Sequence, residues 1–134
     1  MRCLFCQSDT SVEISRPSRK SSAVWRRRQC NACYKAFSTR EKPDLSLSVT
    51  VKKPSGQNEP FSEDKLLISV YDCLSHRKDA LEASRALIDT IVRLILPVKT
   101  VEVSSIEIRT VVLKVLKHFD KAAYTYYQAH HIIS

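Results

Sequence analysis

Four cysteines, arranged as two pairs in the first third of the chain, constrain its fold more than any other feature. The pairs are CLFC at residues 3–6 and CNAC at residues 30–33. Each pair can place two sulfurs on one tight turn, and two such turns form a tetrahedral tetrathiolate site, which favours zinc. Residues 1–44 have no helical periodicity and little aliphatic content, so metal binding is expected to replace a hydrophobic core here.

A structural zinc is the favoured interpretation of this quartet, and an iron–sulfur cluster or redox-active dithiols are the alternatives. Four protein thiolates fill a tetrahedral zinc shell, which argues against a catalytic zinc with an open position. One Zn²⁺ per chain is therefore expected at Cys3, Cys6, Cys30 and Cys33. Cys73 stands alone among apolar residues and is expected to be a small core residue.

The compartment is inferred from two absences in the sequence. The N-terminus has no apolar region typical of a signal peptide, and no apolar run approaches the roughly 18 residues of a membrane span. We therefore expect a cytoplasmic protein that does not enter the membrane. Paired cysteines in that compartment bind metal more often than they form disulfides.

The formal net charge of +8 is concentrated in the cysteine-containing segment. Residues 1–46 hold ten Lys/Arg against four Asp/Glu, whereas residues 47–134 hold twelve against ten. The basic residues include Arg26, Arg27 and Arg28 in an expected strand, with Arg16, Arg19 and Lys20 in the preceding segment. A rigid basic surface favours nucleic acid, because guanidinium forks match phosphates and guanine edges. The alternative is a solvated basic strand that only prevents edge pairing.

Residues 45–134 have the pattern of a separate α+β domain. A polar linker around Pro43 separates it from the first, which gives domain boundaries of 1–44 and 45–134. Strict alternation of Leu45, Leu47, Val49 and Val51 with polar residues predicts a half-buried strand. The segment KKPSGQNEPF contains the only glycine and predicts a turn into a short second strand at 59–61.

Capping residues and helical periodicity predict about four helices after this hairpin. Ser62 is a good N-cap for the first helix. The second is expected to begin near Asp79, with Glu82 completing a capping box, and to end at Pro97. The third is expected to begin at Ser104, with a capping box to Glu107, and to bury Ile108, Val112, Val115, Leu116 and Phe119. The tyrosine-rich C-terminal segment predicts a fourth, short helix.

Several motifs resemble, in order and spacing, the NrdR-type transcriptional repressors of bacterial ribonucleotide reductase genes. They are CLFC, SVEISR, VWRRRQCNACYKAFSTRE, VTVKK, NEPFSEDKL and FDKAAY, and together they extend over essentially the whole chain. The resemblance implies a zinc ribbon that binds DNA, followed by an ATP-cone that senses ATP against dATP by changing oligomeric state. Trp25 is a departure, because the family has the first of four arginines there.

The resemblance also implies which residues form each site. The zinc ligands map onto the four paired cysteines, and the DNA-contacting residues map onto Arg16, Arg26, Arg27 and Arg28. The nucleotide-binding residues map onto Lys52, Lys53, Glu59, Phe61 and Lys65. Without the resemblance, two lysines beside a turn indicate no more than a solvated strand end, and the sequence contains no P-loop.

The function implied is a nucleotide-sensing, zinc-dependent repressor that binds double-stranded DNA at promoters as a homo-oligomer. The alternative is a zinc-ribbon adaptor that binds RNA or protein, with the cone kept only as a scaffold. An enzyme is not expected, because the sequence has no candidate nucleophile–base pair, no open metal site and no glycine-rich phosphate loop.

Overall fold

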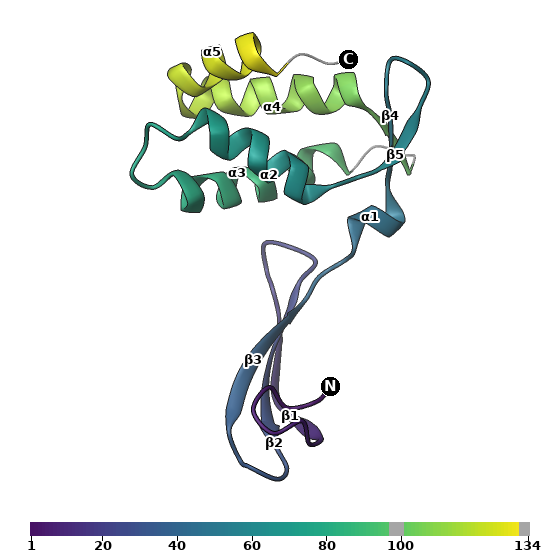
Figure 1. Cartoon of the computed structure of the whole chain (residues 1–134), viewed down its shortest axis with the longest axis vertical. Coiled ribbons are helices and arrows are strands. Elements are labelled where there is room, and N and C mark those ends of the chain that lie inside the picture. Colours follow the sequence, from purple (N-terminus) through teal and green to yellow (C-terminus); the bar gives the residue numbers. More distant parts are fainter. Residues whose placement is uncertain (97–100, 132–134) are drawn as a thin grey trace. The chain divides into compact units, whose positions relative to one another are not determined.

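The chain consists of two compact units, Met1–Pro43 and Asp44–Ser134. The computed structural model describes residues 1–96 and 101–131 (Figure 1). The first unit is built from strands, and the second combines a small sheet with helices. This arrangement confirms the α+β class, with a small β ribbon followed by a hairpin and helices.

The first unit is a three-stranded antiparallel sheet with the arginine-rich strand at its centre. Its strands are β1 (Thr10–Pro17), β2 (Val24–Cys30) and β3 (Ala36–Glu41), in the order β1-β2-β3. Of its 43 residues only Cys3 and Cys30 are buried, with 0% and 1% of their surface exposed. The unit therefore has no hydrophobic core, as the sequence predicted, and its two most buried side chains are thiols.

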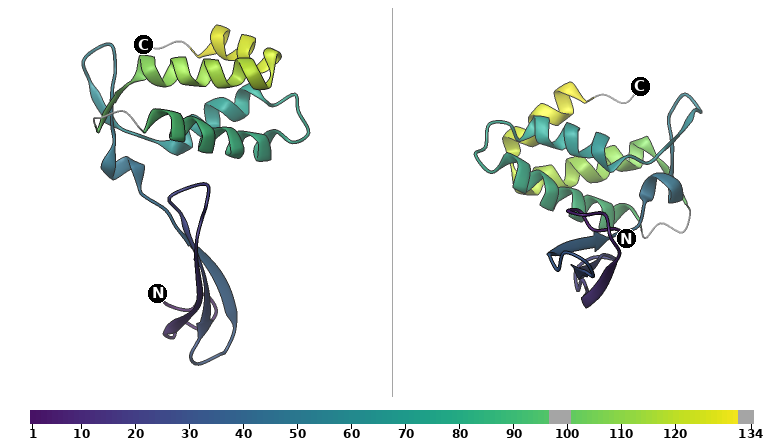
Figure 2. Two further views of the ribbon diagram at one scale, coloured as in Figure 1. Left: turned by 180° about the vertical axis from the view of Figure 1, so that it is seen from behind. Right: turned by 60° about the horizontal axis from the view of Figure 1, so that its bottom comes forward.

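The second unit places four longer helices beside a second three-stranded sheet (Figure 2). In this sheet β4 (Thr50–Lys52) lies between antiparallel β5 (Asn58–Pro60) and parallel β6 (Glu102–Ser104). The helices are α2 (Glu63–Cys73), α3 (Ala80–Ile95), α4 (Ser105–Phe119) and α5 (Lys121–His130). No helix in the described ranges is long and apolar enough to cross a bilayer.

The core of the second unit is formed where the helices pack on one another. Leu87, Ile88 and Ile91 lie on one face of α3, because residues three and four apart along a helix are neighbours. Val70 and Leu116, from α2 and α4, are fully buried in the same cluster. Cys73 belongs to this core and donates its thiol to the Ser69 carbonyl at 3.1 Å, which confirms its predicted role.

Two of the three predicted helix starts have the expected cap. The Ser62 hydroxyl accepts from the Lys65 N–H, and Ser104 forms the predicted capping box with Glu107. The capping box predicted at Asp79 is wrong, because Arg77 holds the Asp79 carboxylate through Nε at 2.9 Å and Nη2 at 3.2 Å. The predicted helix end at Pro97 lies outside the described residues, and α3 ends at Ile95.

The strand predicted from Leu45 to Val51 is half wrong, because its first part is the short helix α1 (Leu45–Ser48). The Asp44 carboxylate accepts from the Ser46 N–H at 3.0 Å, and the Ser48 hydroxyl donates to the Asp44 carbonyl at 2.9 Å. Such local bonds from Asp and Ser compete with strand pairing. Leu47 is consequently 86% exposed, and only the second half of the pattern forms β4.

Five apolar residues of α4 were predicted to be buried. Two of them are fully buried, two are partly buried and one is exposed. Val112 and Leu116 are fully buried, and Ile108 and Val115 pack against the core. Phe119 is 41% exposed and lies under the guanidinium of Arg77, 4.7 Å from its ring centroid. The sequence pattern also gave no sign of β6, whose three residues are too few for a periodicity.

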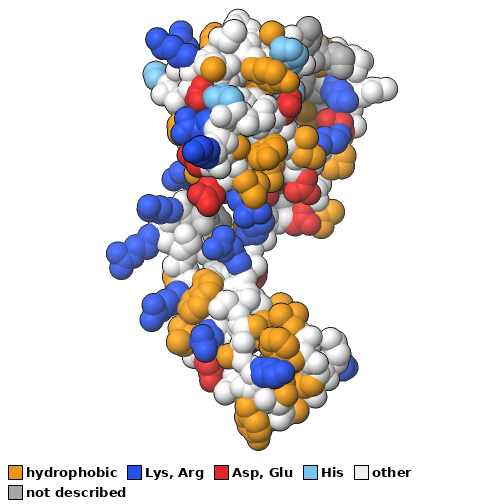
Figure 3. All heavy atoms as spheres, turned by 60° about the vertical axis from the view of Figure 1, so that its left-hand side comes forward, with side chains coloured by type: hydrophobic (Ala, Val, Ile, Leu, Met, Phe, Trp, Pro, Cys, Tyr) orange, Lys and Arg blue, Asp and Glu red, His pale blue; other side chains and the backbone are white. Residues whose placement is uncertain are grey.

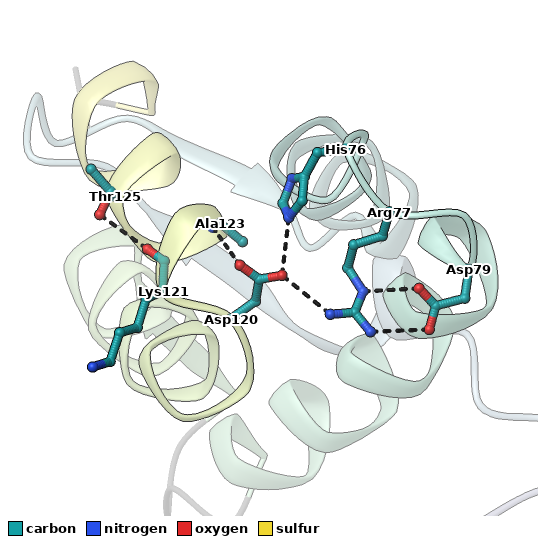
Figure 4. A network of polar contacts seen from close by, with 7 residues as sticks. All are labelled: His76, Arg77, Asp79, Asp120, Lys121, Ala123 and Thr125. Atoms are coloured by element: carbon teal, nitrogen blue, oxygen red, sulfur yellow. Dashed lines mark hydrogen bonds and ion pairs between the residues drawn. The ribbon is translucent and has the colours of Figure 1, made fainter.

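A polar network joins the α2–α3 turn to the junction of α4 and α5 (Figure 4). Asp120 accepts from the Ala123 N–H at 3.0 Å, which caps α5, and its other oxygen contacts His76 Nε2 at 3.0 Å and Arg77 Nη1 at 3.2 Å. Burial alone raises the pKa of Asp120, but these hydrogen bonds lower it overall. The ionised carboxylate therefore ties two helix junctions together.

This network predicts a specific acid sensitivity of the second unit. Because the folded pKa of Asp120 lies below its ordinary value of 3.8, its stabilisation is present above that pH and is lost as pH falls through the lower, folded value. Asp120→Ala is expected to lower the free energy of unfolding by about 2 kcal/mol at neutral pH.

Denaturant titrations at several pH values check this expectation. Asp120→Asn keeps a side chain that can cap α5 and removes the titrating charge, so it is the matched control. Its loss of stability on acidification should be smaller than that of the wild type. An equal loss in both proteins would show that the carboxylate of Asp120 does not carry this dependence.

Candidate functional site

The four paired cysteines converge at one end of the ribbon. Their sulfur atoms all lie within 4.8 Å of one another, with Cys6 and Cys30 at 3.4 Å and Cys3 and Cys33 at 3.7 Å. A tetrahedral zinc with Zn–S bonds of about 2.3 Å places its sulfurs about 3.8 Å apart. The donor set and its size therefore fit one zinc ion held by four thiolates.

The backbone around each cysteine pair supports metal-binding thiolates. The Phe5 N–H donates to Cys3 Sγ, and the N–H groups of Ala32 and Cys33 donate to Cys30 Sγ, all at 3.3 Å. The residues that follow each pair, Gln7 and Tyr34, have positive φ angles of 65° and 60°, which turn the chain tightly away from the sulfurs.

The same environment favours the ionised form of at least one ligand. Hydrogen bonding from the side chain and backbone of Ser8 lowers the pKa of Cys6 to about 6. The thiolate is the form that binds metal. Because four protein sulfurs leave no open coordination position, the site can hold the ribbon together but offers no place for a substrate.

The predicted DNA-contacting arginines lie in β1 and β2 but do not share one face of the sheet. Arg26 pairs across the sheet with Ser15 and Thr39, whereas Arg27 pairs with Ile14 and Ser38. Because successive residues of a strand point to opposite faces, Arg26 and Arg28 lie on one face and Arg27 on the other. Arg16 pairs with Trp25, which places it on the Arg27 face.

The three consecutive arginines have partners within the ribbon. Arg26 forms a hydrogen-bonded ion pair with Glu41, which lowers the pKa of that carboxyl. Arg27 Nε lies 3.6 Å from Glu13, and Arg28 Nη1 lies 3.4 Å from the Thr10 hydroxyl. The positive charge of the run is therefore partly balanced within the unit.

Arg40 is a basic residue of this sheet that the sequence analysis did not single out. It lies in β3 and pairs directly with Trp25, so Trp25 has Arg40 on one side and Arg16 on the other. Both arginines are exposed. No signal along the sequence links position 40 to position 25, because the link is a cross-strand register.

Three of the predicted nucleotide-binding residues form one cluster at the hairpin of the second unit. Glu59 Oε2 accepts from Lys53 Nζ at 3.3 Å and from Lys65 Nζ at 3.4 Å. Burial works against the ionised form, but these two lysines lower the pKa of Glu59 overall. Lys52 precedes Lys53 in the chain, pairs with Asn58 on β5 and is exposed, but no ion pair or hydrogen bond among the described residues joins it to this carboxylate.

Phe61 differs from the other predicted nucleotide contacts because it is buried. Its ring is 2% exposed within the hydrophobic core, and its N–H donates to the Val49 carbonyl at 2.9 Å. In this conformation the ring is not open to a base. Phe61 instead anchors the end of β5 against the core, next to Glu59.

A pocket of about 400 Å³ continues from Lys65 along α2 to the end of α5. Its lining comprises Lys65, Ile68, Ser69, Tyr71, Asp72, Ser75 and His131. The volume lies in the range of small-molecule sites, and the lining combines apolar side chains with charged ones. Sequence reasoning missed this pocket, because α2 residues meet His131 only through helix packing.

Taken together, the tetrathiolate ribbon and the α+β unit that follows it in the sequence define a zinc-ribbon protein whose second unit has a ligand-sized pocket. Comparison with known sequences gives the same result. A family model described as "Transcriptional repressor NrdR-like, N-terminal domain", a zinc ribbon, matches residues 1–41.

Whole-chain relatives extend this match to the second unit. Transcriptional repressor NrdR of Phenylobacterium zucineum is 40% identical over 95% of this chain and 82% of its own length. The proteins of the same name from Symbiobacterium thermophilum and Mesorhizobium japonicum are 37% and 41% identical, each over 92% of this chain and over 82% and 78% of their own lengths. The chain belongs to the NrdR family of transcriptional repressors, as its motifs indicated.

The ribbon is expected to unfold when its metal is removed, because no hydrophobic core replaces the four sulfur–metal bonds. A strong chelator should shift the amide resonances of residues 1–43 to random-coil positions in a ¹H–¹⁵N spectrum. The resonances of the second unit should stay in place. Cys3→Ser should have the same effect and lower the zinc content of the purified protein.

Cys73→Ala is the matched control for the loss of a buried thiol. It removes a core sulfur outside the quartet, so zinc content and ribbon resonances should both be retained. A Cys3→Ser protein that keeps one zinc per chain and a folded ribbon would contradict this account of the site.

Proposed function

We propose that this protein is a zinc-dependent repressor that binds double-stranded DNA at promoters of ribonucleotide reductase genes and responds to ATP and dATP. The observation that carries the proposal is the ribbon, in which a tetrathiolate site supports an arginine-rich sheet and which matches the NrdR family model over residues 1–41. One zinc at Cys3, Cys6, Cys30 and Cys33 has a structural role. The arginines Arg16, Arg26, Arg27 and Arg28 serve DNA binding, directly or by shaping the sheet.

The nucleotide site of this proposal lies at the hairpin and along α2. Lys53 and Lys65 already contact one carboxylate oxygen, so both ammonium groups are directed toward an anion between them. The phosphates of a nucleotide compete with Glu59 for these lysines, and Lys52 adds a further charge beside them. The N-terminus of α2 favours negative charge as well.

The pocket beyond Lys65 has room for the ribose and base. Its apolar residues, Ile68 and Tyr71, suit a flat ring, and Ser69, Asp72 and His131 offer hydrogen-bonding groups. Glu59 and Phe61 then have different roles. Glu59 is exchanged for phosphate or turns to the sugar, whereas Phe61 holds the hairpin against the core.

Nucleotide sensing requires a second state that the nucleotide favours, and we propose that this state is a homo-oligomer. Hydrophobic side chains are exposed on the helical unit (orange in Figure 3). Ile68, Leu94 and Ile106 are among the exposed apolar residues, at 69%, 50% and 57% of their surface. Ile68 also lines the pocket, so a bound nucleotide alters this surface directly. As a bacterial repressor the protein acts in the cytoplasm, on the nucleoid.

Other functions find less support. No observation favours an RNA- or protein-binding adaptor over the repressor. The relatives are named transcriptional repressors, and that name does not describe an enzyme.

Lys65→Ala is expected to weaken binding of ATP and dATP by about 10- to 100-fold, because a hydrogen bond to a charged group contributes about 1.5–3 kcal/mol. Isothermal titration calorimetry on the zinc-loaded protein measures this change. Lys114→Ala is the control, because Lys114 is an exposed lysine on α4 that does not line the pocket. Equal affinities of the Lys65 and Lys114 variants would remove the nucleotide site from this position.

The repressor proposal predicts that nucleotide changes DNA affinity. The probe is a labelled duplex from the region upstream of a ribonucleotide reductase gene, titrated with protein loaded with ATP, with dATP or with neither. DNA binding is expected in at least one state and should differ between the two nucleotides. Identical binding in all three states would contradict sensing, whereas absence of binding in all three would contradict the repressor function itself.

A further inference from the structure

One face of the ribbon sheet carries a tryptophan with an arginine on either side of it. This row crosses all three strands and consists of Arg16 on β1, Trp25 on β2 and Arg40 on β3, paired directly with one another. Cross-strand partners share a face, and Arg27, two residues along β2, points to the same side. Both outer arginines are exposed and the tryptophan between them is half-buried.

The two outer arginines also differ from the three consecutive arginines of β2, each of which has a side-chain partner within the ribbon. In the described part of the chain, no side-chain ion pair or hydrogen bond engages Arg16 or Arg40, and Arg27 has only an exposed pair with Glu13 at 3.6 Å. Exposed pairs of this kind contribute little stability, so Arg27 can exchange Glu13 for another anion without a large penalty.

The opposite face is more closed. Arg26 is bound to Glu41, and Arg28 lies between its cross-strand partners Val12 and Phe37. The Nε atom of Arg28 is buried and has no hydrogen-bond partner among the described residues, so this edge of its guanidinium is directed into the protein. These two arginines shape the sheet more than they present charge to a ligand.

We propose that the face formed by Arg16, Trp25, Arg27 and Arg40 is the surface that contacts double-stranded DNA, and that Arg40 is a phosphate-binding residue. This inference rests on the proposed DNA-binding function. Trp25 stands where the family that the sequence resembles has an arginine, and Arg40 supplies positive charge on the neighbouring strand, directly beside that position.

The geometry suits two phosphate contacts with an apolar surface between them. Strands lie about 4.8 Å apart, so the Cα atoms of Arg16 and Arg40 are separated by about 10 Å across the sheet. Their flexible side chains can reach two phosphates of the duplex, and the planar guanidinium can hold each in a bidentate manner. The Trp25 ring then faces the sugars between the two phosphates and excludes water from both contacts.

The test measures DNA affinity of the full-length, zinc-loaded protein against salt concentration by fluorescence anisotropy. The probe is a labelled duplex that the wild-type protein has enriched from a random library. Arg40→Ala should weaken binding by about tenfold and reduce the salt slope by about one, as expected for one lost phosphate contact. Arg40→Lys should keep the slope, and Arg16→Ala should behave like Arg40→Ala.

Two further variants separate this proposal from its alternatives. Lys35→Ala, which removes an exposed lysine that lies over the Phe5 ring and outside this face, should leave the salt slope unchanged. Trp25→Arg combined with Arg40→Ala should restore the slope, because charge returns one strand away on the same face. Zinc content and ribbon resonances report whether each variant is folded.

Each other outcome would overturn the assignment in a recognisable way. A slope reduced by Arg26→Ala but unchanged by Arg40→Ala would place the DNA on the opposite face. Equal binding to a double-stranded RNA of the same sequence would overturn DNA as the specific partner. If the wild-type protein enriches no duplex at all, the proposed repressor function fails together with this inference.

Discussion

The tetrathiolate cluster is the interaction on which the first unit depends. With only Cys3 and Cys30 buried, this unit cannot gain the free energy of folding from hydrophobic burial, whereas four sulfur–metal bonds can supply it. The consequence reaches beyond stability. A ribbon without a core has both faces of its sheet open to solvent, so a strand such as β2 can carry three consecutive arginines without burying any of them completely.

The two units handle positive charge in a similar way. In the ribbon, Glu41 and Glu13 pair with Arg26 and Arg27, and in the second unit Glu59 lies between Lys53 and Lys65. Carboxylates of this kind keep basic groups oriented and limit their mutual repulsion before a polyanion arrives. A phosphate can then replace a carboxylate at little electrostatic cost, because one anion exchanges for another. Arg16 and Arg40 differ from these paired residues, because no described carboxylate contacts either of them, and both lie in the same cross-strand row of the sheet.

In the second unit, apolar packing stabilises the helices, and polar contacts set the positions of the helix junctions. The helices obtain their stability from a continuous core that includes Leu116 and Ile91. Asp120 and Arg77 instead fix where the helices begin and how their junctions meet (Figure 4). The pocket lies outside this core, between one face of α2 and His131 at the end of α5.

Sequence alone determined whatever is encoded locally. The spacing within each cysteine pair predicted the two halves of the metal site, and Ser62 and Ser104 predicted two helix starts, because a turn or a cap needs only residues three or four apart. Where local signals competed, the prediction from sequence was wrong. Asp44 caps the short helix α1, whereas the alternation of apolar and polar residues had predicted a strand there. The tertiary structure decided what depends on long-range pairing: the burial of Phe61, the two lysines on Glu59, and the register that places Arg40 beside Trp25. No spacing along the chain encodes these contacts, because they arise only when strands and helices pack in three dimensions.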